Sequence, residues 1–203
     1  MLARAMQWPN EELLKAAERV LIYLHAHRHL HLRYTSVGVP SASWAPSAGE
    51  TTDGFYGESD ASFDTSRSTS AYIFFWASAA IAWCMRKQAS IALSSFEAEI
   101  MAGSLAACEA VFLRGILTFL GFPQTGSTLL RMDNSAAIDV AKNPTNHAKS
   151  KHIMRRELHV RELVERGILG VKHVKTSENT ADMLSKHLER VPFQKHRRTV
   201  FNM

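Results

Sequence analysis

Three short runs between residues 54 and 87 have the hydrophobic pattern of β-strands. Residues 54–63 alternate between apolar and polar side chains, residues 71–78 are β-branched and aromatic, and residues 79–87 form a third extended run. Runs of this length and composition are typical of strands. Because the connections between them are short, we predict that the three strands pair as an antiparallel meander.

After residue 90 the pattern changes to helices alternating with strands. A long apolar helix is predicted over residues 94–120, with Gly121 as its C-terminal cap. It is followed by a strand at 127–132, helices at 134–142 and 150–166, a strand at 168–175 and a helix at 180–187. This order predicts an α/β fold in which one mixed sheet carries packed helices.

The first 53 residues differ from the rest of the chain in composition and hydrophobic pattern. Residues 9–34 have helical spacing of apolar side chains after a possible N-cap at Asn10, whereas residues 35–53 are rich in Ser, Thr, Gly and Pro. Such a composition is typical of a linker. We therefore place a domain boundary near residue 50.

Composition and charge narrow the class of protein. With 203 residues, 46% of them hydrophobic, the chain has the composition of a globular domain and not of a disordered one. It lacks a run of about 18 apolar residues and a signal-peptide pattern, so we expect no membrane association. The net charge of +5 suits a polyanionic partner. The two cysteines, Cys84 and Cys108, are expected to be buried thiols in a reducing compartment.

Four acidic residues lie near the ends of predicted elements. They are Asp60, Glu99, Asp133 and Asp182. Hard divalent cations such as Mg²⁺ prefer oxygen ligands, and a pair of such ions requires several carboxylates to offset its charge. The His and Cys spacing of a zinc site is not present. The pattern therefore favours a magnesium site of the kind that activates water against a phosphodiester.

Short motifs recur along the chain in a family-specific order. They are residues 57–61 (GESDA), 67–70 (RSTS), 83–88 (WCMRKQ), 92–95 (ALSS) with 97–99 (EAE), 133–135 (DNS), 151–153 (KHI) and 181–182 (AD). Together they resemble the ribonuclease H domain of Ty1/copia-type retrotransposon Pol polyproteins. Residues 1–34 resemble the end of the reverse transcriptase in those polyproteins, but the paired-Asp motif of the polymerase is absent.

The resemblance implies a domain plan and a fold. It covers a ribonuclease H-like domain at 54–190, which follows residues 1–34 and the linker 35–53. The basic run at residues 195–198 marks residues 191–203 as a basic C-terminal tail, which is either a polyanion-binding tail or a disordered end. The implied fold is α/β, with a mixed five-stranded sheet of which three strands are antiparallel, and helices on both faces.

The resemblance also implies an activity and a site. The activity is hydrolysis of the RNA strand of RNA–DNA hybrids by two Mg²⁺ ions, for which Mn²⁺ is a possible substitute. Asp60, Glu99, Asp133 and Asp182 fall on the family's catalytic and metal-binding positions. The expected partners are the hybrid and the reverse transcriptase portion of the same polyprotein, with no membrane. The expected location is intracellular, cytoplasmic or nuclear, in retroelement particles if the element is active.

The choice of Glu99 over Glu97 follows from helix geometry. Residues two positions apart on a helix are rotated by about 200° from each other, so the carboxylates of Glu97 and Glu99 cannot both face one metal site. The stripe that contains Glu99 includes the small residues Gly103, Ala106 and Ala110, which would let the helix approach the sheet closely. We therefore predict that Glu99, and not Glu97, faces the site.

Four further residues are candidates for contacting the substrate. Asn134 could contact a 2′-hydroxyl, but it could equally cap the helix that starts there. Arg67 and Lys151 belong to a set of basic residues that could follow a phosphate backbone, or could simply be solvated. His152 could transfer protons near the scissile phosphate, or lie in a solvated loop.

Two other functions remain open at this point. The first is a catalytically silent remnant of a retroelement that binds nucleic acid or a protein. Retention of all four acidic residues argues against it, since a decayed site would tolerate the loss of any one. The second is a nuclease of the same fold that acts on other nucleic acids, such as an integrase, whose sites usually use three carboxylates.

Overall fold

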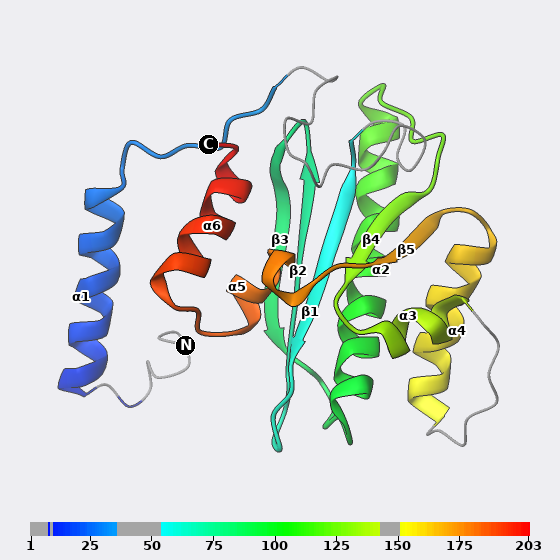
Figure 1. Cartoon of the computed structure of the whole chain (residues 1–203), viewed down its shortest axis with the longest axis horizontal. Helices are drawn as coiled ribbons and strands as arrows, with labels where there is room; N and C mark the ends of the chain where they lie inside the picture. The colour runs from blue at the N-terminus through cyan, green and yellow to red at the C-terminus, as the bar shows by residue number, and fades with distance from the viewer. Residues whose placement is uncertain (1–7, 9, 36–53, 143–150) are drawn as a thin grey trace. The chain divides into compact units, whose positions relative to one another are not determined.

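The computed structural model describes residues 8, 10–35, 54–142 and 151–203, without the side chains of residues 142, 151–154 and 157. The chain divides into two compact units, residues 1–32 and residues 33–203. The linker predicted at residues 35–53 lies almost wholly outside the described residues. Figure 1 shows the elements of each unit.

The first unit contains one helix, α1 (Glu11–Ala26). Asn10 caps it as predicted, because its side chain accepts a hydrogen bond from the Leu13 backbone N–H at 2.8 Å. No residue of α1 is buried, and most of its large apolar side chains are exposed. The helix is shorter than residues 9–34 and ends eight residues before Tyr34.

The second unit is built on a five-stranded mixed sheet. Its strands are β1 (Tyr56–Ser62), β2 (Thr69–Trp76), β3 (Ala79–Lys87), β4 (Thr128–Met132) and β5 (Leu169–His173), in the order β3-β2-β1-β4-β5. The β1–β2 and β2–β3 pairs are antiparallel, and β4 is parallel to both β1 and β5. The predicted meander and mixed sheet are therefore confirmed.

Helices cover both faces of this sheet (Figure 1). On one side are α2 (Ser95–Phe119), α3 (Ser135–Lys142) and α4 (Lys151–Glu165). On the other are the short α5 (Asp182–Ser185) and α6 (Arg190–Phe201), preceded by a 3-10 turn, η2 (Thr176–Glu178). The predicted α/β fold class is thus correct, including helices on both faces.

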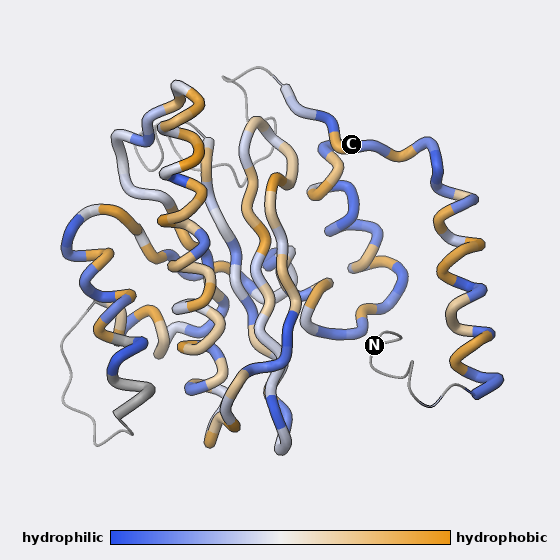
Figure 2. The backbone as a smooth tube through the Cα atoms, turned by 180° about the vertical axis from the view of Figure 1, so that it is seen from behind, coloured by the Kyte–Doolittle hydropathy of each residue, from blue (hydrophilic) through white to orange (hydrophobic). Residues whose placement is uncertain are grey.

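The main core lies between the sheet and α2. Side chains alternate along a strand, so Phe55 and Ala61 point toward α2, whereas Glu58 and Asp60 point toward α5. Helix α2 is long and apolar enough to cross a membrane by length and composition, yet half of that stretch is buried inside this unit. Figure 2 shows its hydrophobic character, in contrast to the mostly hydrophilic α6 on the other face of the sheet. Burial against the sheet explains its composition.

The C-terminal residues differ from the predicted basic tail. Residues 190–201 form helix α6, and His196 on it is only 2% exposed. The backbone N–H of Arg33 donates to the Phe201 carbonyl, and the Asn202 amide donates to the Arg33 carbonyl. The prediction of a disordered end is therefore wrong, while binding of a polyanion by this segment stays a prediction.

The expectation that both cysteines are buried is wrong. Cys84 is partly exposed on β3, and Cys108 is exposed on α2. Cys108 Sγ lies 3.6 Å from His159 Nε2 on α4. Helix α2 is apolar on most of its surface, so the residues around Cys108 did not indicate which of its faces is covered.

Candidate metal centre

Asp60 lies inside β1 and is completely buried. Its side chain points toward α5, where the Ser185 hydroxyl donates a hydrogen bond to Oδ2 and the Lys186 ammonium lies 3.2 Å from Oδ1. Burial raises the pKa of Asp60, while the contacts with Ser185 and Lys186 lower it, with a net increase. A buried carboxylate with a raised pKa binds cations readily, because a positive charge offsets the cost of its desolvation.

Asp133 follows directly after β4 and is partly exposed. Because β1 and β4 are parallel neighbours, their carboxyl ends meet at the same edge of the sheet, which brings Asp133 to Asp60. The Thr176 hydroxyl donates to Asp133 Oδ2 at 2.9 Å. The His173 Nε2 lies 3.2 Å from the Asp133 carbonyl oxygen.

Asp182 is the first residue of α5 and reaches the site through the buried segment before it. The Asn179 amide donates to the Ser59 carbonyl at 2.9 Å, and the Thr180 backbone N–H donates to Glu58 at 2.6 Å. These contacts attach residues 179–181, all nearly inaccessible to solvent, to β1. Asp182 is thereby held beside Asp60, although 122 positions separate them in the sequence.

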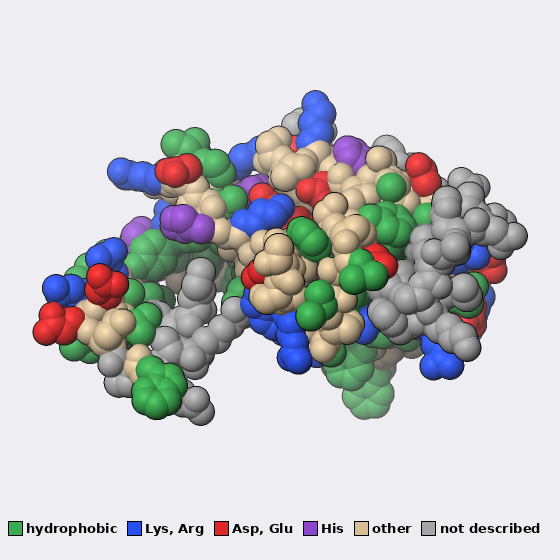
Figure 3. Space-filling view, turned by 90° about the horizontal axis from the view of Figure 1, so that it is seen from below, with side chains coloured by type: hydrophobic (Ala, Val, Ile, Leu, Met, Phe, Trp, Pro, Cys, Tyr) green, Lys and Arg blue, Asp and Glu red, His purple; other side chains and the backbone are tan. Residues whose placement is uncertain are grey.

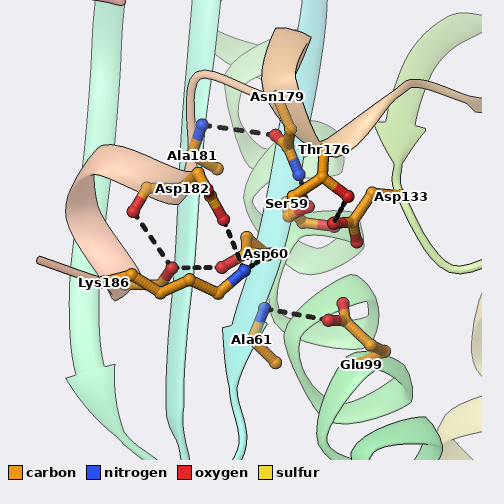
Figure 4. A network of polar contacts seen from close by, with 11 residues as sticks. Ser59, Asp60, Ala61, Glu99, Asp133, Thr176, Asn179, Ala181, Asp182 and Lys186 are labelled. Atoms are coloured by element: carbon orange, nitrogen blue, oxygen red, sulfur yellow. Dashed lines mark hydrogen bonds and ion pairs between the residues drawn. The ribbon is translucent and has the colours of Figure 1, made fainter. Parts of the chain in front are cut away.

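The three aspartates form a compact cluster (Figure 4). One carboxylate oxygen from each of Asp60, Asp133 and Asp182 lies within 4.8 Å of the other two. In the space-filling view of Figure 3, acidic side chains of the larger unit gather beside Lys and Arg side chains.

Glu99 approaches the cluster from α2. It is 7% exposed, and its Oε1 accepts a hydrogen bond from the Ala61 backbone N–H at 3.3 Å. Its Oε2 is buried and has no hydrogen-bond partner among the described residues. Burial, followed by the negative charges of Asp60 and Asp133, raises the pKa of Glu99 to about 9.

Glu97 has a different role, at the start of the same helix. Its carboxylate accepts a hydrogen bond from the Leu93 backbone N–H at 2.8 Å, while the Ser94 hydroxyl accepts one from the Glu97 N–H. This reciprocal arrangement stabilises the helix N-terminus. Of the two glutamates, it is therefore Glu99 that faces the aspartates.

Three observations fit a hard divalent cation at this cluster. The donor set consists of carboxylate oxygens close enough to share an ion. The Glu99 Oε2 atom is buried and has no partner within the described ranges, so in the ionised state of this carboxylate a cation would offset the cost of its burial. The ammonium of Lys186 already lies between Asp60 and Asp182, which shows that the position accepts positive charge.

The four residues predicted to contact the substrate are spread over separate segments of the chain. Asn134 caps α3, because its Oδ1 accepts the Ala137 N–H at 3.0 Å. Arg67 is exposed in the loop between β1 and β2, and its carbonyl oxygen accepts a hydrogen bond from Lys87. Lys151 and His152 are the first residues of α4, but their side chains lie outside the described part of the chain.

Sequence reasoning missed three residues that contact the aspartates. They are Thr176, Ser185 and Lys186. Lys186 had a detectable signal, because it stands four residues after Asp182 and opposite charges at that spacing meet on a helix. Thr176 and Ser185 had none, since hydroxyl residues near a helix end are common.

A cavity of about 600 Å³ lies beside the cluster, between β1 and α6. Its wall contains the buried ion pair between Glu58 and Arg131, whose atoms Oε1 and Nη1 are 3.0 Å apart. None of the three clustered aspartates lines it. The ion pair also stacks its guanidinium 5.5 Å from the Tyr56 ring centre, so its role is to hold the sheet together beside the site.

Comparison with known proteins finds relatives among the Pol polyproteins of plant transposons. No family model matches the chain. It is 32% identical over 197 residues to the Pol polyprotein of transposon RE1 from Arabidopsis thaliana, and 37% identical over 131 residues to that of transposon TNT 1-94 from Nicotiana tabacum. These alignments cover 95% and 64% of this chain but only 13% and 10% of the relatives. The chain is homologous to copia-type retrotransposon Pol polyproteins.

Solved structures with the same arrangement are ribonuclease H domains. The chain superimposes on an N-terminal ribonuclease H domain from Mycobacterium tuberculosis with a TM-score of 0.50 and 12% identity, covering 71% of this chain and 96% of that one. For ribonuclease H1 from Halobacterium salinarum the TM-score is 0.50 with 15% identity, covering 64% and 93%. The unit formed by residues 33–203 thus has the ribonuclease H fold.

Proposed function

We propose that this copia-type domain hydrolyses the RNA strand of RNA–DNA hybrids with two divalent cations, Mg²⁺ in the first place. The observation that carries the proposal is the meeting of Asp60, Asp133 and Asp182 within 4.8 Å at the edge of a ribonuclease H-type sheet. The full polyproteins are far longer than this chain, so the proposal does not include their other activities.

The acidic residues that would hold the cations differ in how rigidly the fold positions them. Asp60 is rigid, because it lies within a central strand and is completely buried. Asp133 precedes α3 and Asp182 begins α5, and Glu99 offers a carboxylate oxygen that has no hydrogen-bond partner in the described part of the chain. A bound pair of divalent cations supplies Lewis-acid stabilisation of the phosphodiester and makes water more acidic for the attack.

The protein around the cluster orients these ligands. Thr176 donates a hydrogen bond to Asp133 and Ser185 donates one to Asp60, which fixes one oxygen of each carboxylate. The second oxygen of Asp60 contacts the Lys186 ammonium at 3.2 Å. Glu99 is kept in place by the Ala61 N–H. Arrangements of this kind reduce the reorganisation needed when charge develops on a phosphodiester.

The proposed partners follow from the relatives. The substrate is an RNA–DNA hybrid, recognised through the 2′-hydroxyls that distinguish its two strands. The net charge of +5 supports binding to such a polyanion. A second proposed partner is the reverse transcriptase portion of a Pol polyprotein, because the relatives are Pol polyproteins of which this chain covers 10% to 13%.

The experiment is cleavage of an RNA–DNA hybrid labelled separately on each strand. We expect cutting of the RNA strand only, dependent on Mg²⁺ or Mn²⁺ and stopped by EDTA. Asp60→Asn should reduce cutting to background, because it removes a charge from the centre of the cluster. The matched control is Asp64→Asn, which removes a carboxylate paired with Lys87 on the surface and should cut normally.

Three outcomes would contradict the proposal. Cutting that persists in Asp60→Asn would mean that the metal site is elsewhere. Equal cutting of both strands would indicate a nuclease with another substrate. A folded protein that binds the hybrid without cutting it, with or without added reverse transcriptase, would favour a silent binding module.

A further inference from the structure

Lys186 lies within the acidic cluster and not at its rim. Its Nζ is 3.2 Å from Asp60 Oδ1 and also forms an ion pair with Asp182 Oδ1. The side chain is 35% exposed, whereas Asp60 is fully buried and Asp182 is 10% exposed at its side chain. The ammonium therefore enters the cluster from solvent and contacts the buried oxygens with its tip (Figure 4).

The two carboxylates that Lys186 contacts belong to the set that would bind a divalent cation. One oxygen each of Asp60, Asp133 and Asp182 lies within the 4.8 Å limit, and the ammonium occupies one carboxylate oxygen on two of the three residues. A cation bound at the cluster and the ammonium would repel each other at this separation. They therefore compete for the same negative charge.

From this geometry we propose that Lys186 is a built-in counter-ion, a positioning residue that holds Asp60 and Asp182 together until a divalent cation replaces it. The inference rests on the cation site of the proposed function. Without an ammonium, the carboxylates of Asp60 and Asp182 would repel each other in the metal-free protein. Lysine suits this role, because its single charge sits on a flexible four-carbon chain that can withdraw to solvent.

The chemistry of Lys186 sets the direction of the effect. Removing the ammonium frees two oxygens and removes a positive charge from the approach of the cation. The affinity of the cluster for Mn²⁺ should therefore increase, while the metal-free protein should become less stable. A purely structural role would predict the opposite for affinity, because a disordered cluster binds a cation more weakly.

The test measures binding of Mn²⁺ alone, by calorimetry and by electron paramagnetic resonance of the free ion. Lys186→Met should bind Mn²⁺ about tenfold more tightly than the wild type, which is a typical size for coupling between two sites. Lys186→Arg retains the charge and should return the affinity to the wild-type value. The control is Lys87→Met, since Lys87 has a similar exposed fraction, 32%, but pairs with Asp64 away from the cluster. This variant should bind Mn²⁺ as the wild type does.

A melting measurement makes the test independent of how well Lys186→Met folds. In EDTA this variant should melt at a lower temperature than the wild type, and its gain on adding Mn²⁺ should be larger. Lys186→Gln, which is also neutral, should behave in the same way and replaces Lys186→Met if that variant is insoluble.

Unchanged or weaker Mn²⁺ binding in both neutral variants would overturn the proposal, as would wild-type protein that binds no Mn²⁺. Neither readout uses the hybrid, so the failure of cleavage in a protein that binds Mn²⁺ would contradict the proposed function alone.

Discussion

Replacing Glu99 by Gln in the metal-free protein should remove a specific pH dependence of stability. Burial and the neighbouring aspartates raise the pKa of Glu99 from its ordinary 4.5 to about 9. Between these values the folded protein keeps a proton on Glu99 that the unfolded chain releases. A group whose pKa is raised on folding stabilises the protein below its unfolded pKa, and this stability is lost as the pH rises toward the folded pKa.

The size of the effect follows from one proton. Each pH unit in this window lowers the free energy of unfolding by up to about 1.4 kcal/mol. Between pH 7 and pH 8.5 the loss should therefore be about 2 kcal/mol, or a decrease in Tm of roughly 4–8 °C for a unit of this size. Burial lowers the pKa of His196, so its contribution to stability increases with pH, opposite to that of Glu99. The range from pH 7 to pH 8.5 lies above the ordinary pKa of histidine and so avoids this contribution.

The assay is thermal unfolding in EDTA, followed by circular dichroism at several pH values. Wild-type Tm should decrease across the window, whereas Glu99→Gln should change much less and should melt higher than the wild type at pH 8.5. Asp60 also has a raised pKa, but both proteins contain it, so the difference between them reports Glu99. Equal slopes in the two proteins would refute the reasoning. Adding Mg²⁺ should flatten the wild-type curve, because a cation favours the ionised carboxylate.

Two further predictions concern the sheet and its helices. Gly57→Ala should destabilise the protein by about 1–3 kcal/mol in urea unfolding, because the added Cβ would come within 2.3 Å of the Phe74 ring. Gly115→Ala, on α2 with open space at that position, should instead stabilise it by up to about 1 kcal/mol, and a loss there would contradict the packing argument. Glu58→Gln should cost about 3–5 kcal/mol, because Arg131 loses its buried carboxylate, and the double variant Glu58→Gln/Arg131→Met should recover part of that loss in the same measurement.

Much of the fold could be predicted from local patterns. The strand meander at residues 54–87 and the long helix after it were read from alternation and helical spacing, and their bounds differ from the structure by one or two residues at most ends. Such patterns report directly whether side chains fall on one face of a strand or helix. The predictions that failed rested on amino-acid composition and not on the spacing of apolar residues. The charged C-terminal segment forms helix α6, and Cys108 lies on the exposed side of an apolar helix.

The site was predictable only in part. The family motifs indicated which acidic residues to consider, and helix geometry separated Glu99 from Glu97. The candidate contacts were harder, because Asn134 carries the same sequence signal whether it caps a helix or binds a substrate, and here it caps α3. The catalytic roles of the four acidic residues remain predictions until cleavage is measured.

The sequence by itself determined the elements and their order, because hydrophobic periodicity is a property of neighbouring residues. Only the tertiary structure decided which distant residues share an environment. Parallel pairing of β1 with β4 brings Asp133 to Asp60, and residues 179–181, buried against β1, bring Asp182 to the same point. That meeting sets the position of Lys186 and adds the charges of Asp60 and Asp133 to burial, which is the largest cause of the raised pKa of Glu99.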